Sequence, residues 1–156
     1  MSMYSDLEEG ILAGLKMDSA LSGVATFSNE LRECLFTGEK LTQGFRPEEL
    51  PAIRATAQEK PSTSAPFSVG EIACTIPVTV IVITRGGTKQ EAHERSLALQ
   101  EPLLANLQSM RKSGNGLGLN TYLIGDTSAT SLVIEEKPIH FALATVEAQF
   151  LKVVQL

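Results

Sequence analysis

One stretch of the chain, from Glu71 to about Arg85, constrains the fold more than any other feature. Apolar residues occupy every second position there without a break: Ile72, Cys74, Ile76, Val78, Val80 and Val82. Successive side chains of a β-strand point to opposite faces of the sheet, so these residues share one buried face. The chain must therefore build its core around one unusually long strand.

The opposite face of the same strand changes character along its length. It is half polar at its start, around Thr75 and Pro77, and apolar at its end, at Ile81 and Ile83. This gradient predicts that a helix covers only the last part of that face. Pro77 has no N–H to donate to a ladder, so it indicates a sheet edge or a β-bulge.

Two helices are expected. The first carries a capping-box signature, in which Ser5 caps the helix and the Glu8 side chain reaches back to the cap. The second follows the turn Arg85-Gly86-Gly87 and repeats the signature with Thr88 and Glu91, while Pro102 predicts a kink or a division. The stripe of the first helix at helical spacing is Tyr4, Leu7, Ile11, Leu12 and Leu15.

Further strands are predicted after Pro51 and over residues 119–124, 132–136 and 139–154. In the last of these, Phe141 and Leu143 share one face and Val146 and Phe150 the other, so a bulge is expected near residues 144–145. The pattern from residue 22 to residue 49 is mixed and fits neither a helix nor a strand. The expected fold is α+β, a mainly antiparallel mixed sheet with two helices packed on one face.

The whole chain, residues 1–156, has the length of one globular domain. Flexible loops are expected near residues 37–50 and 60–68. The second of these holds two prolines and four hydroxyl residues: Pro61, Ser62, Thr63, Ser64, Pro66 and Ser68. This composition is typical of a mobile loop.

Composition argues against most enzyme classes. The chain has two His, two Cys, no Trp and eight aromatic residues, so the side chains that build metal sites and catalytic triads are scarce. His93 lacks a metal-binding partner three or four positions away and is expected to be solvated, while Cys74 fits a core position. We therefore expect no enzyme activity, no catalytic residue, no cofactor and no metal.

The net charge of −5 lies entirely in the first third of the chain. Through Leu50 there are nine acidic and four basic residues, and the remainder balances at nine of each. No basic stripe is present that could follow a row of phosphates, so sequence-specific nucleic-acid binding is not expected. The apolar run Ile76–Ile83 is too short for a membrane helix, and no signal-peptide pattern opens the chain, so a cytoplasmic protein without a membrane partner is expected.

The order of segments resembles the tail-terminator family of tailed phages and prophages, also described as tail-completion or minor tail proteins. The resemblance covers most of the chain as a pattern of elements. It is carried by the first helix at 5–16, the strand entry Leu50-Pro51-Ala52-Ile53-Arg54, the strand at 76–82, the Ala- and Leu-rich helix after Gly86-Gly87, and the closing strand that ends at 150–154.

This resemblance implies a homo-oligomeric ring, expected to be a hexamer, that caps the tail tube, stops its polymerisation and presents a docking surface for the head. Its partners would be further copies of the chain, the tail tube protein and a head-completion or connector protein. It would be found in the host cytoplasm during assembly and then in the virion tail. An acidic lumen wall would let DNA pass without sticking.

Subunit and tube contacts are expected at the loop before the long strand and on that strand. The predicted interface residues are Pro61, Ser62, Thr63, Ser64, Pro66, Pro77 and Thr79. The loop is expected to be disordered in the free protein and to become ordered on contact with the tube. The alternative functions are another non-catalytic interaction subunit, such as a head-completion or adaptor protein, and, ranked below it, a small-ligand binder or an enzyme.

Overall fold

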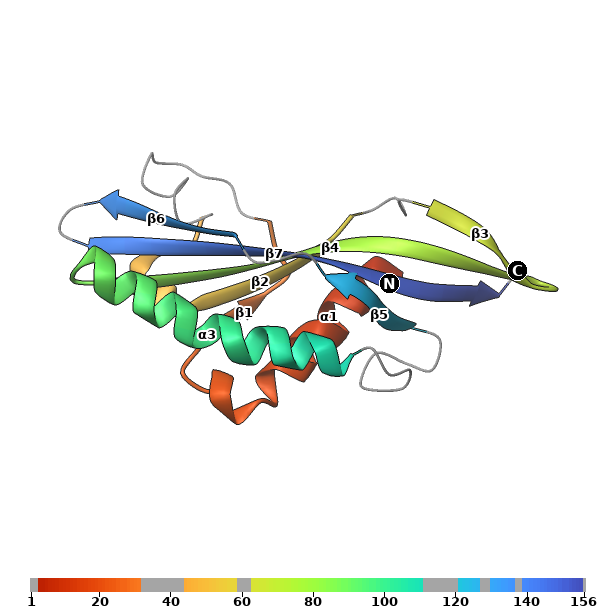
Figure 1. The fold of residues 1–156 in the computed structure, drawn as a ribbon, viewed down its shortest axis with the longest axis horizontal. Helices are drawn as coiled ribbons and strands as arrows, with labels where there is room; N and C mark the ends of the chain where they lie inside the picture. The colour runs from red at the N-terminus through yellow and green to blue at the C-terminus, as the bar shows by residue number, and fades with distance from the viewer. Residues whose placement is uncertain are drawn as a thin grey trace.

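The fold is known from a computed structural model, which describes residues 3–31, 44–58, 63–110, 121–126, 130–136 and 139–155. Its centre is a pair of long antiparallel strands, β4 (Glu71–Gly86) and β7 (Ile139–Gln155). Their register is continuous from Glu71 opposite Gln155 to Gly86 opposite His140. Figure 1 shows that this pair runs the length of the molecule.

Shorter strands flank the central pair on both sides and complete a seven-stranded sheet. On the outer side of β4, β2 (Ala52–Ala57) covers one half and β3 (Thr63–Ser68) the other. On the outer side of β7, β6 (Thr130–Glu136) and β5 (Thr121–Asp126) divide the length in the same way. β1 (Thr26–Ser28) pairs with β2 in the one parallel contact of the described sheet.

Helices α1 (Met3–Lys16) and α3 (Lys89–Ser109) lie on the same face of the sheet (Figure 1). Leu15 of α1 and Leu107 of α3 join one buried cluster with residues of β2, β4 and β7. The strand residues on this face are those predicted from the alternation, and Ile76, Val78, Val80 and Val82 have no exposed surface. The expected α+β architecture is therefore confirmed.

The start of α3 is the one that the sequence predicts. Thr88 is the N-cap, and its Oγ1 accepts a hydrogen bond from the Glu91 N–H at 3.1 Å. The Glu91 carboxylate accepts from the Gly87 N–H at 3.2 Å, one residue before the cap. Pro102 lies inside α3 without dividing it, because the helix continues to Ser109 and Leu103 and Leu107 stay fully buried beyond the proline.

The second face of the sheet is covered by a different element from the helix that we expected. A second cluster consists of Phe45, Leu50, Ala52, Ile81, Ile83 and Phe141. Phe45 and Leu50 belong to residues 44–50, which include the short 3-10 helix η2 (Pro47–Glu49). Where the sequence predicts a loop, residues 44–50 pack onto the end of the sheet through these two buried side chains. Residues 37–43 lie outside the described residues.

This two-sided burial also removes the expected bulge in β7. Phe141 faces the second cluster and Val146 faces the helices, yet the pairing with β4 passes residues 144 and 145 without a shift. Apolar residues occupy both odd and even positions here because both faces of the sheet are covered near this end. The change of pattern therefore marks a change of burial, and the backbone stays regular.

Pro77 lies in the interior of the sheet, opposite Gln149 of β7, and so the expectation of an edge or a bulge is wrong. The Pro77 carbonyl accepts a hydrogen bond from the Gln58 N–H at 3.0 Å, so the ring nitrogen faces the same side of β4. β2 pairs as far as Val78 and β3 begins its pairing at Thr75. The missing N–H thus falls in the gap between two neighbouring strands, where no ladder bond is lost.

The predicted loop over residues 60–68 is a strand for most of its length. Residues 60–62 lie outside the described residues, but Thr63–Ser68 form β3 and pair with β4. β4 extends beyond the end of β2, so its free backbone groups there can pair with a second strand. A register shift between Pro66 and Ser68 accommodates the proline.

Candidate functional site

The predicted interface residues fall into three groups in the structure. Pro61 and Ser62 lie outside the described residues. Thr63, Ser64 and Pro66 belong to β3, whose backbone pairs with residues 72–75 of β4. Pro77 and Thr79 lie in the middle of β4, on the face opposite the helices. The structure thus places the described members of the set on two adjacent strands, and their register positions alternate between the two faces of the sheet.

The helix-free face carries a polar row at Thr79. Thr56 of β2 lies opposite Thr79, and Glu147 of β7 lies opposite Thr79 on the other side. The Thr79 hydroxyl donates to Glu147 Oε2 at 3.0 Å. Both threonines are half-buried and Glu147 is exposed. This row separates the second apolar cluster from the part of the sheet that the helices do not reach.

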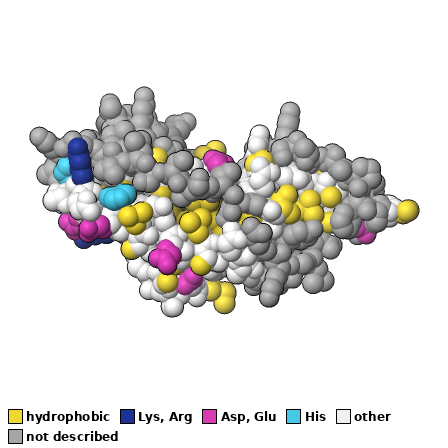
Figure 2. All heavy atoms as spheres, in the orientation of Figure 1, with side chains coloured by type: hydrophobic (Ala, Val, Ile, Leu, Met, Phe, Trp, Pro, Cys, Tyr) yellow, Lys and Arg dark blue, Asp and Glu magenta, His cyan; other side chains and the backbone are white. Residues whose placement is uncertain are grey.

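The part of the sheet beyond the buried cluster that it shares with the helices, which we term the sheet arm, consists of β3, residues 71–75 of β4 and residues 151–155 of β7. Figure 1 shows both helices ending well before the tip of the arm. Figure 2 shows apolar side chains at the surface in the right half of the molecule, where Figure 1 places the arm. Ile72 and Leu151 of the arm are half-buried. At the tip, Val69 is fully exposed beside Gly70, whose positive φ of 78° forms the turn. Sequence reasoning missed Val69, although a Val-Gly pair between two strands was an available signal.

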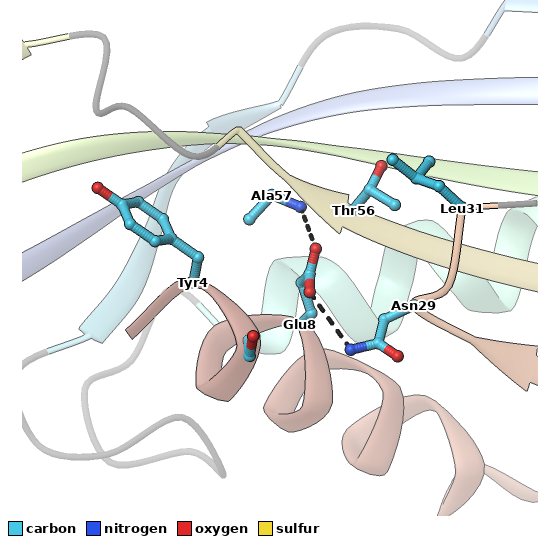
Figure 3. A pocket seen from close by; sticks show the side chains of 7 residues that line it. Tyr4, Glu8, Asn29, Leu31, Thr56 and Ala57 are labelled. Atoms are coloured by element: carbon cyan, nitrogen blue, oxygen red, sulfur yellow. Dashed lines mark hydrogen bonds between the residues drawn. The ribbon is translucent and has the colours of Figure 1, made fainter. Parts of the chain in front are cut away.

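A pocket of about 650 Å³ opens where the start of α1 meets the end of β2. Its lining residues are Tyr4, Ser5, Glu8, Asn29, Leu31, Thr56 and Ala57 (Figure 3). The half-buried Glu8 carboxylate is bonded on both oxygens: Oε2 accepts from the Ala57 N–H at 2.6 Å and Oε1 accepts from Asn29 Nδ2 at 3.3 Å. These bonds join α1 to the ends of β1 and β2.

The capping role predicted for Glu8 is therefore wrong. The helix begins at Met3, so Ser5 lies inside its first turn. Residue 8 and its partner at residue 57 are 49 positions apart, and no local pattern connects them. This pocket is a feature that sequence reasoning could not find.

His93 is less exposed than the sequence predicts. His93 and His140 are half-buried, and the Nδ1 atom of each is buried without a hydrogen-bond partner among the described residues. The expectation of a solvated His93 is wrong, because α3 lies close against the sheet at this end. Within the described ranges, no group of three or more His, Cys, Asp or Glu side chains could hold a metal ion.

Cys74 is buried in the core of β4, as its place in the alternation predicts. Within the described helices, none combines the length and the apolar character needed to cross a membrane.

Comparison with known proteins adds a likeness of fold. No protein-family model matches the chain, and no curated protein matches its sequence. A chain in the solved structure of the virion of a native gene transfer agent (GTA) particle has the same fold, with a TM-score of 0.53 and 13% sequence identity. The match covers 96% of this chain and 98% of that chain, so it extends over the complete architecture.

Proposed function

We propose that this protein is a structural subunit of a phage-like virion, and that it forms a hexameric ring that caps the tail tube. The ring ends tube polymerisation and offers the surface to which the head docks, through a head-completion or connector protein. The observation that carries this proposal is the fold shared with a GTA virion chain over nearly the full length of both chains. The finer role of a tail terminator rests on the resemblance in the order of the segments.

A subunit of this kind acts through its contact surfaces, and two features of the structure support the proposal. Among the described residues, no helix covers the sheet arm or the face that carries Thr79, and an uncovered sheet face with apolar side chains is suited to packing against another chain. On α1, Asp6 and Glu9 are exposed and belong to the acidic first third of the chain. Acidic side chains on a lumen wall would repel the phosphates of passing DNA.

The molecular mass in solution tests whether the chain forms a ring. We expect the purified chain at micromolar concentration to show a mass near six times the 16.8 kDa of one chain by light scattering, and a ring in negative-stain images. Thr79→Arg is expected to shift the mass towards the monomer, because a charged side chain is added within the predicted interface. Ala105→Arg, at an exposed position of α3, is the matched control and is expected to keep the ring.

A wild-type chain that stays monomeric at these concentrations would contradict the ring. If both arginine variants assemble equally well, the ring stands but the placement of the interface at Thr79 is wrong. Thermal melts of both variants distinguish a lost interface from a lost fold.

A test of the capping role requires purified tube protein. When purified tube protein polymerises in the presence of this chain, we expect tubes that carry a ring at one end and stop growing. Tube length measured by electron microscopy should fall as the ratio of this chain to tube protein rises. Tubes of unchanged length with bare ends would contradict the capping role while leaving a structural role elsewhere in the virion.

A further inference from the structure

We draw no further inference here: the strongest candidate, the apolar surface of the sheet arm at half-buried Ile72 and Leu151 and exposed Val69, carries none, because nothing in the described part of the structure shows what covers it.

Discussion

Gly86→Ala is expected to destabilise the fold by about 3 kcal/mol, at the upper end of the cost of overpacking a core. A Cβ built at Gly86 would lie 2.6 Å from the backbone nitrogen of Ala92 and 3.0 Å from the carbonyl carbon of Glu91. Both are main-chain atoms of the first turn of α3, so no side chain can rotate away. The Thr84 hydroxyl donates to the Ala92 carbonyl at 2.8 Å and anchors the same turn to β4.

Gly87→Ala provides the matched control. The nearest atom to its Cβ is Glu91 Oε2 at 3.5 Å, an ordinary contact, and Gly87 is exposed. We expect its free energy of unfolding to change by less than about 1 kcal/mol, because alanine also restricts the unfolded chain. Urea denaturation of both variants measures the difference. Equal stabilities would show that α3 does not approach β4 as closely as the structure has it.

Phe150→Ala is expected to cost about 4 kcal/mol, which is the range for removing a buried aromatic ring. Phe150 has no exposed surface and lies opposite Ile76 of β4 and Leu123 of β5. All three side chains belong to the buried cluster that the sheet shares with the helices, so the ring lies at the centre of the core. Its loss leaves a cavity that rigid strands on both sides cannot close.

Leu97→Ala is the control for this variant. Leu97 lies on α3 and is 47% exposed, so its truncation is expected to cost less than about 1 kcal/mol. The two free energies of unfolding, measured by urea denaturation on the same chain, should differ severalfold. If Phe150→Ala is as mild as Leu97→Ala, the helix-covered face is not the main source of stability.

Elements with a local physical origin were predictable. The alternation from residue 71 to residue 85 predicts β4 within one residue, because a period of two is a direct record of a strand buried on one face. Thr88 as the cap of α3 also follows from short-range chemistry, since the hydroxyl bonds to an amide three residues away. The α+β class and the single helical face follow from the same periodicities.

Patterns with two possible origins were misread. Pro77 indicated an edge because it cannot donate, but a gap between β2 and β3 satisfies the same condition inside the sheet. The apolar end of β4 on its second face indicated a helix, whereas Phe45 and Leu50 cover it. The sequence correctly predicts that the Pro77 nitrogen makes no ladder bond and that the apolar end of β4 is buried. Which element lies beside each of them depends on residues far away in the chain.

By itself, the sequence determined the period of β4 and of α1, the start of α3, the scarcity of catalytic side chains and the acidic character of the first third. The tertiary structure alone decided that β3 completes the arm, that residues 44–50 cover the second face, and that Glu8 joins α1 to β1 and β2. The reason is physical: periodicity and capping act within a few residues along the chain. The Glu8 bond to Ala57 joins residues 49 positions apart, which only the packing of α1 on the sheet brings together.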